Sequence, residues 1–279
     1  MGTDPIPPQI QLEKTYNSAA DHYDHPAVSF WDRFGRRTVE RMSLVPGMKV
    51  LDVCCGIGGS ALPAAERVGP TGKVLAIDLA QNLLNKGIKR AKASGLTNIE
   101  FRRGDLAVLP FPDRSFDAVI SVFGIFFVPD LSGAIRGLWR LLKPNGILAI
   151  TIWGAKLFEP ADAKFWEAVD REDPELLKSI KPWSKIVEPD PLRALLTECG
   201  VTDPNVAEEP GSHPLSCPED WWTIVMGSGY RSTVEAISSP TRERVKSATI
   251  EAVRQAKIQK VRTDVIYALA RKGPSMKAT

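Results

Sequence analysis

Short apolar runs alternate with amphipathic segments along the first half of the chain. The runs have the length of buried strands, and the segments between them have the period of helices. The predicted strands are 48–53, 73–77, 99–103, 118–123 and 147–152. The predicted helices between them are 60–68, 82–94 and 131–142. This alternation indicates an α/β domain built on parallel strands.

The pattern is less regular outside this stretch. Two helices, 15–25 and 30–42, are predicted before the first strand. From Trp153 the composition turns aromatic and proline-rich. Farther on, we expect a helix over 190–200, an apolar-aromatic stretch at 218–226, a helix from Ser239 to about 256, and a last strand at 265–270. Ser239 is the predicted cap of its helix, with Pro240 in the first turn.

The segment from Val50 to Gly59 is the most informative part of the chain. A predicted strand ends near Asp52 and a turn with Gly56 and Gly58 follows it. The next strand ends on Asp78. A strand, glycine loop, helix, strand and acidic residue in this order are typical of a site for a ribose-bearing cofactor.

Two classes of cofactor fit such a unit, and Asp52 distinguishes them. A dinucleotide site needs G-x-G-x-x-G, whose glycine positions are Cys54, Gly56 and Gly59 here, so two of the three fit. A carboxylate at the mouth of the loop would repel a pyrophosphate but attract an ammonium group, by a few kcal/mol at about 4 Å near a surface. The charge therefore favours S-adenosylmethionine over NAD.

At this point the chain resembles the class I S-adenosylmethionine-dependent methyltransferases, in particular the ubiquinone, menaquinone and natural-product branch. The resemblance extends from about Tyr16 to Ile152. It rests on five pieces in order: Leu51–Gly58, Asp78, Gly104–Leu106 with Leu109–Phe111, Phe116–Ile120, and Leu142–Gly146. It implies a Rossmann-like seven-stranded sheet with helices on both faces and a helical insert that covers the acceptor. Cys54 departs from the usual glycine, and we expect its backbone to stay at negative φ.

The resemblance also implies a domain map. Residues 1–14 are expected to be a disordered lead-in, and 15–152 the cofactor-binding core with its N-terminal helices. Residues 153–188 are the expected lid insert. The remainder of the core, 189–273, contains a second cover segment at about 212–238 and the last strand, and 274–279 form a tail.

The resemblance assigns roles to the acidic residues. Asp52 would bind the methionine ammonium, and Asp78 would bind the ribose hydroxyls or merely cap the helix that follows it. Asp105, with the amide of Leu106, would bind the adenine or merely form a turn. Tyr16 and Tyr23, on one helical face, would contact the cofactor or only pack. The predicted cofactor-binding residues are Tyr16, Tyr23, Asp52, Cys54, Gly56, Gly58, Asp78, Leu79, Gly104, Asp105, Leu106 and Phe123.

Aromatic residues suggest the nature of the acceptor. The predicted acceptor pocket contains Phe126, Phe127, Trp153 and Trp183, which points to a small, largely apolar or aromatic molecule. Methyl transfer by in-line displacement depends mainly on alignment, which can contribute roughly 7–11 kcal/mol, so no conspicuous catalytic pair is required. His22 and His25 are candidates for a general base, or are ordinary solvent-exposed histidines beside Asp21 and Asp24.

Composition narrows the remaining possibilities. Of the 279 residues, 43% are hydrophobic and 25% charged, as in a soluble globular protein. We find neither a membrane-length apolar stretch nor a signal-peptide pattern, and the four cysteines have no zinc-site spacing. We therefore expect a cytoplasmic protein without a metal or a stable membrane association. The acceptor's identity, the atom methylated and the oligomeric state stay open.

Two other functions are weighed against this one. The segment 242–262 is rich in basic residues, but an apolar stripe behind them favours a docked helix, and the net charge is only +3. An RNA or protein methyltransferase would be expected to have an added recognition domain or an Asn-Pro-Pro-Tyr motif, where this chain has Ser121-Val122-Phe123-Gly124. A third possibility is a non-catalytic module that keeps the fold and binds S-adenosylmethionine, but the intact Asp52, Gly56, Gly58, Asp78 and Asp105 argue against decay of the cofactor site. We therefore expect no nucleic-acid partner.

Overall fold

The computed structural model describes residues 8–178, 184 and 186–274. The chain divides into two compact units, each made of three segments. Unit 1 comprises Met1–Phe30, Lys156–Ile180 and Ser212–Thr263, and unit 2 comprises Trp31–Ala155, Lys181–Gly211 and Asp264–Thr279. Most of the predicted cofactor residues belong to unit 2.

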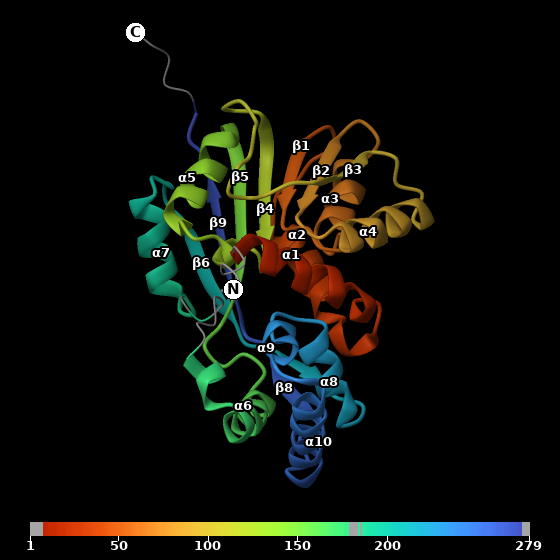
Figure 1. Cartoon of the computed structure of the whole chain (residues 1–279). Helices are drawn as coiled ribbons and strands as arrows, with labels where there is room; N and C mark the ends of the chain where they lie inside the picture. Colours follow the sequence, from red (N-terminus) through yellow and green to blue (C-terminus); the bar gives the residue numbers. More distant parts are fainter. Residues whose placement is uncertain (1–7, 179–183, 185, 275–279) are drawn as a thin grey trace, which may run out of the picture. The chain divides into compact units, whose positions relative to one another are not determined.

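Unit 2 is built on a seven-stranded sheet in the order β3-β2-β1-β4-β5-β9-β6 (Figure 1). The strands from β3 to β5 run parallel, and β9 is antiparallel to both of its neighbours. The strands are β1 (Lys49–Val53), β2 (Lys73–Asp78), β3 (Ile99–Arg103), β4 (Phe116–Val122), β5 (Leu142–Trp153), β6 (Asn205–Glu209) and β9 (Val265–Arg271). The predicted α/β class and seven-stranded sheet are confirmed.

Helices cover both faces of this sheet. Small and branched side chains of α2 (Phe30–Arg41) and α3 (Ala61–Val68) pack with Val50, Ala118 and Ala149 on one face. On that face α4 (Gln81–Ala93) brings Gly87 against Phe101 of β3. The opposite face is covered by α5 (Leu131–Leu141) and α7 (Pro189–Glu198). Because helices bury both faces of the sheet, the sequences of its central strands are almost continuously apolar.

Unit 1 is mostly helical. It contains α1 (Pro8–Ala19), α6 (Ala161–Glu172), α8 (Glu219–Met226), α9 (Arg231–Ala236), α10 (Ser239–Gln255), the short 3₁₀ turns η1 (Ala20–His22), η2 (Pro26–Val28) and η4 (Pro174–Lys178), and a ribbon of β7 (Ser212–Pro214) with β8 (Lys260–Arg262). Its core is aromatic: Phe158, Phe165 and Trp221 are fully buried. The hydroxyl of Tyr230 donates to Asp162 at 2.5 Å within this core.

Several predicted boundaries differ from the observed ones. Helix α1 begins at Pro8, so residues 8–14 of the expected lead-in are helical. The cap of α10 is Ser238, whose hydroxyl accepts from the Thr241 amide, and not Ser239. The helix predicted from Ser239 to about 256 spans Ser239–Gln255, but residues 260–262 of the basic segment form a strand that pairs with β7. Propensity gives way here to tertiary pairing.

Candidate cofactor site

The loop between β1 and α3 has an unusual backbone. Cys54, Gly56 and Gly58 have φ values of 56°, 55° and 89°. The expectation that Cys54 stays at negative φ is therefore wrong, and this non-glycine residue adopts the left-handed region. A Cβ at Gly58 would lie 3.1 Å from Leu62 and 3.2 Å from Phe101, so a side chain there would enter the protein interior.

The side chain of Cys54 has a partner in the chain that follows β4. A Cβ placed on Gly124 would lie 2.2 Å from the Cys54 Cβ and 2.6 Å from its Sγ. Cys54 therefore occupies the space that any side chain at residue 124 would need. Burial and the carboxylates of Asp78, Asp52 and Asp105 raise the pKa of the Cys54 thiol, which stays protonated at neutral pH.

Asp78 ties the loop to the end of β2. Its Oδ2 accepts from the amide of Gly56 at 2.8 Å, and its Oδ1 accepts from the amide of Ala80 at 2.9 Å. Burial raises the pKa of Asp78, whereas its hydrogen bonds from the amides of Ala80, Gly56 and Leu79 oppose the shift. The carboxylate therefore orders the loop and the start of α4 whatever else it binds.

Asp52 is fully buried below the same loop. Its Oδ2 accepts from the Ser60 hydroxyl at 2.7 Å, and its Oδ1 has no hydrogen-bond partner among the described residues. Burial raises the pKa of Asp52 to about 7, the Ser60 hydrogen bond lowers it, and Asp78 raises it further. A buried carboxylate oxygen without a partner is costly, and a cationic ligand would relieve that cost.

The third acidic residue follows β3. The Oδ1 of Asp105 accepts from the amide of Ala107 at 2.8 Å, so Asp105 forms a turn. The amide of Gly104 donates to the carbonyl of Asp78 at 3.0 Å, which holds this turn beside the end of β2. Leu106 is buried and Leu79 half-buried. Asp52, Asp78 and Asp105 all come from carboxyl ends of adjacent parallel strands.

Four aromatic rings gather where β4 and β5 end. Phe123 and Trp153 stack with centroids 3.8 Å apart and planes 7° from parallel. Trp31 and Phe34 meet both of these rings edge-on. Phe123 has a φ of 55°, and its amide donates to the carbonyl of Thr151. The stack is therefore held by backbone as well as by ring contacts.

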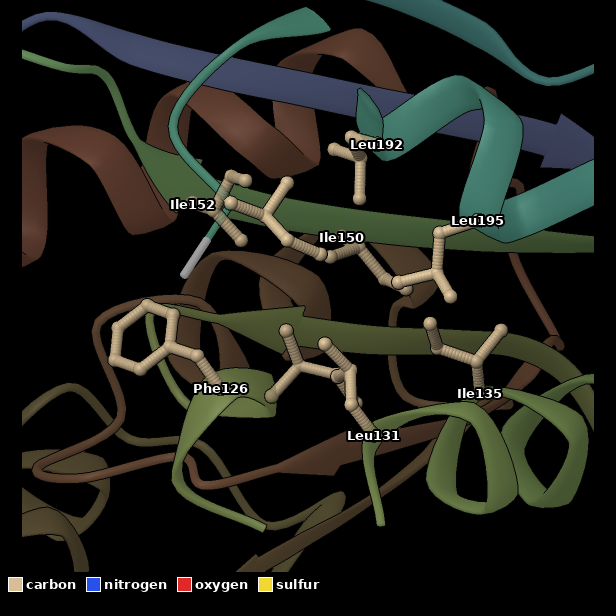
Figure 2. Close-up of a pocket in the computed structure, with 9 residues that line it drawn as sticks. Phe126, Leu131, Ile135, Ile150, Ile152, Leu192 and Leu195 are labelled. Atoms are coloured by element: carbon tan, nitrogen blue, oxygen red, sulfur yellow. The ribbon is translucent and has the colours of Figure 1, made fainter. Parts of the chain in front are cut away.

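Phe126 is buried and faces an apolar cavity. It lines an apolar cavity of about 10 Å³ under the short turn η3 (Ile125–Phe127), where side chains of α5, α7 and β5 converge (Figure 2). A cavity of this size holds about one water at most. The residues that line it are Ile125, Phe126, Leu131, Ile135, Ile150, Ile152, Ile186, Leu192 and Leu195. This cavity is too small for an aromatic acceptor, while Phe127 is half-buried.

The remaining predicted residues are in unit 1 or outside the described residues. Tyr16 lies on α1, Tyr23 follows η1, and both belong to unit 1. His22 has a buried Nδ1, and burial followed by the nearby Arg231 lowers the pKa of its imidazole. The Nδ1 of His25 accepts from the amide of Ala27 at 3.1 Å. Trp183 lies outside the described residues.

Two residues that form hydrogen bonds within the site were not predicted. The hydroxyl of Ser60 donates to Asp52, and the guanidinium of Arg90 on α4 donates to the carbonyl of Ile57 at 3.2 Å. Ser60 carries a weak signal, as a serine directly before a helix. Arg90 carries none, because an arginine on a polar helix face is common.

With this geometry in place, comparison with known proteins decides the family. The model of the ubiE/COQ5 methyltransferase family matches residues 9–163, more than half of the chain. The chain belongs to the ubiE/COQ5 methyltransferase family. The predicted resemblance to class I methyltransferases of the quinone branch is thus confirmed. The matched region includes the glycine loop, Asp78, Asp105 and the Phe123–Trp153 stack.

Relatives and solved structures extend the comparison. The demethylmenaquinone methyltransferase of Geobacillus stearothermophilus is 37% identical over 141 residues, which cover 49% of this ubiE/COQ5 family member and 60% of the relative. The chain thus spans about 60% of the length of the curated relatives it matches. Phosphoethanolamine N-methyltransferase 2 of Haemonchus contortus has a TM-score of 0.60 at 17% identity, with 96% of this chain and 61% of that one covered. The [4+2]-cyclase SpnF has a TM-score of 0.55 at 22% identity, with 88% and 81% covered. These two structures share the fold.

Proposed function

We propose that the protein transfers a methyl group from S-adenosylmethionine to a small, largely apolar or aromatic acceptor of the quinone type. Family membership supports the reaction class. The name of the demethylmenaquinone methyltransferases supports the acceptor class. The observation that carries the proposal is Asp52, a buried carboxylate with one unpartnered oxygen under a glycine loop. Such a group suits a ligand with an ammonium group and opposes a pyrophosphate.

The residues of unit 2 fit this cofactor. Asp52 would hold the ammonium, Asp78 the ribose hydroxyls, and Asp105 with the Leu106 amide the adenine. Gly56 and Gly58 allow the left-handed loop backbone that lies between the first two carboxylates. The bound cofactor supplies a methyl group on a sulfonium, which is already strongly electrophilic.

The contribution of the chain is then alignment and exclusion of water. The stacked rings of Phe123 and Trp153 are 6% and 3% exposed, so they form a rigid apolar wall at the ends of β4 and β5. Rigid placement of two reactants can contribute roughly 7–11 kcal/mol to lowering a barrier. Aromatic faces also tolerate nearby positive charge. For an acceptor that must lose a proton, His22 and His25 remain the candidate bases.

Quinones are apolar molecules, so we looked for features of the chain that would contact a membrane or another partner. Among the described residues, we find no helix long and apolar enough to cross a bilayer. The basic side chains of α10 are partly neutralised within unit 1, since Arg244 pairs with Glu172 and Arg254 with Glu219. We propose a small-molecule partner and no nucleic acid, which these ion pairs support.

Two measurements test the proposal. Titration calorimetry with S-adenosylmethionine measures whether the cofactor binds. Release of S-adenosylhomocysteine is then followed with a demethylmenaquinol analogue, simple phenols, an indole, an amine and an RNA as acceptors. Binding with release on the quinol supports the proposal. Release on RNA alone would favour a nucleic-acid methyltransferase, and binding without release on any acceptor would favour a non-catalytic module. The cyclase SpnF illustrates that the fold alone does not decide the reaction.

A further inference from the structure

Arg90 connects three separate parts of unit 2. Its Nη1 and Nη2 donate to the two carboxylate oxygens of Asp32 on α2, at 2.9 and 2.8 Å. Its Nη1 also donates to the carbonyl of Ile57, within the glycine loop, at 3.2 Å. The planar fork of a guanidinium suits this combination of one carboxylate and one carbonyl, which an ammonium group would not match.

The backbone of α2 also lies directly against the loop. A Cβ on Gly59 would be 2.9 Å from the carbonyl oxygen of Trp31, and a Cβ on Gly35 would be 2.3 Å from the carbonyl carbon of Gly59. Asp32, the partner of Arg90, therefore stands on the helix turn that touches the loop. Arg90 and α2 together restrain residues 57–59.

Restraint matters here because the glycines leave the loop backbone free to take other conformations and because Cys54 is strained. Cys54, Gly56 and Gly58 are all in the left-handed region. The two glycines adopt this region freely, whereas for Cys54 it persists only where the surrounding structure enforces it. Asp78 holds the amide of Gly56 through one hydrogen bond, and Arg90 holds the carbonyl of Ile57, which lies between Gly56 and Gly58.

We propose that Arg90, held by Asp32, is a positioning residue that keeps the glycine loop in its cofactor-binding conformation. The inference rests on the proposed function. The side chains of Arg90 and Asp32 are 31% and 45% exposed, so their ion pair contributes little to the free energy of folding. The effect of losing Arg90 should thus appear in cofactor affinity and not in stability.

The test compares Arg90→Met with Arg36→Met. Arg36 pairs with Glu66 at 3.2 Å with both side chains about half exposed, and so links α2 to α3 by a similar ion pair. We expect Arg90→Met to raise the Kd and KM for S-adenosylmethionine roughly fivefold to tenfold, with kcat at saturation and Tm nearly unchanged. Arg90→Lys should be intermediate, and Asp32→Asn milder than Arg90→Met, because it leaves the hydrogen bond to Ile57.

The outcomes separate this inference from the proposed function. An Arg90→Met affinity within about twofold of the unaltered chain would overturn the positioning role, as would an equal loss in Arg36→Met. A fall in Tm that accounts for the whole effect would also overturn it. If the unaltered chain binds no S-adenosylmethionine, the proposed function itself fails and this inference with it.

Discussion

Phe123 and Trp153 lie face to face, with ring centroids 3.8 Å apart and an interplanar angle of 7°. Trp153 ends β5, Phe123 directly follows the neighbouring parallel strand β4, and both residues are almost completely buried. The stack lies at the strand ends where the predicted cofactor residues Asp52, Asp78 and Asp105 are found. It therefore combines a packing role with a place beside the proposed chemistry.

The packing role predicts the effect of truncating Trp153. Trp153→Ala should lower the free energy of unfolding by about 3–5 kcal/mol, because it removes a buried ring and leaves a cavity. Trp153→Phe keeps a ring in the stack and should lose much less. Denaturant unfolding followed by circular dichroism measures both values. Equal losses in the two variants would show that the stack adds nothing.

Phe127 is a better position than Trp153 for testing the predicted acceptor pocket. It is half-buried and lies after β4, so its truncation should lower stability less. Phe127→Ala should lower turnover of a quinol acceptor at least tenfold while the Kd for S-adenosylmethionine changes only a few-fold. Phe126→Ala is the matched control, since Phe126 packs into a cavity with aliphatic residues and should mainly lower stability. Lost cofactor binding with normal turnover at saturation would place Phe127 in the cofactor site instead.

The contact between Cys54 and Gly124 predicts a suppressor. Gly124 has a φ of −115°, which any residue can adopt, so Gly124→Ala is opposed mainly by the collision with Cys54. We expect Gly124→Ala to weaken S-adenosylmethionine binding at least tenfold by displacing the loop. Calorimetry should show that the double change Cys54→Gly with Gly124→Ala restores most of the affinity. A double variant no better than Gly124→Ala would contradict this coupling.

The raised pKa of Asp52 predicts a pH dependence of cofactor binding. An ammonium group favours the ionised carboxylate, so binding should lower the pKa of Asp52 from about 7 and release a proton. Affinity should rise between about pH 6 and pH 8 and then level off. Calorimetry in buffers of different ionisation enthalpy counts the protons released. Asp52→Asn should bind weakly with no such dependence.

The raised pKa of Asp52 also makes the stability of the protein depend on pH. The pKa of Asp52 is raised above its ordinary value of 3.8, so the folded state binds the proton more tightly than the unfolded state. The contribution of this group to stability is therefore present below about pH 4 and is lost as the pH rises through about 7. Asp52→Asn should unfold at a higher temperature than the unaltered chain at pH 8, which differential scanning calorimetry can measure.

Asp78 separates cofactor binding from capping. Asp78→Ala removes the acceptor of two backbone hydrogen bonds, so both cofactor affinity and the order of α4 should suffer. Asp78→Asn has a single acceptor oxygen, so it keeps one of these two backbone hydrogen bonds, places its NH2 group against the other backbone N–H, and loses the charge-assisted bonds to ribose, each worth about 1.5–3 kcal/mol. The Kd for S-adenosylmethionine should rise at least tenfold in Asp78→Asn, with a smaller fall in Tm than in Asp78→Ala, because one backbone hydrogen bond is kept. An unchanged Kd would leave Asp78 as a structural cap.

Much of unit 2 was predictable from local pattern. The apolar strands, the helices between them and the turn with Gly56 and Gly58 are set by side-chain period and backbone permissiveness, which are local properties. Strand β6 (Asn205–Glu209) was not predicted, because its short polar sequence forms a strand only by pairing with β9. Edge strands often depend on such pairing more than on their own propensity.

The amino-acid sequence by itself determined the class of sheet, the glycine loop and the order of the acidic residues at its edge. Tertiary structure alone decided that Cys54 is left-handed against Gly124, that Asp52 is fully buried with one unpartnered oxygen, and that Arg90 reaches Asp32 across 58 residues. The physical reason is the distance along the chain over which each effect acts. Propensity and period act between near neighbours, whereas burial, pKa and side-chain contacts depend on residues that only the folded chain brings together.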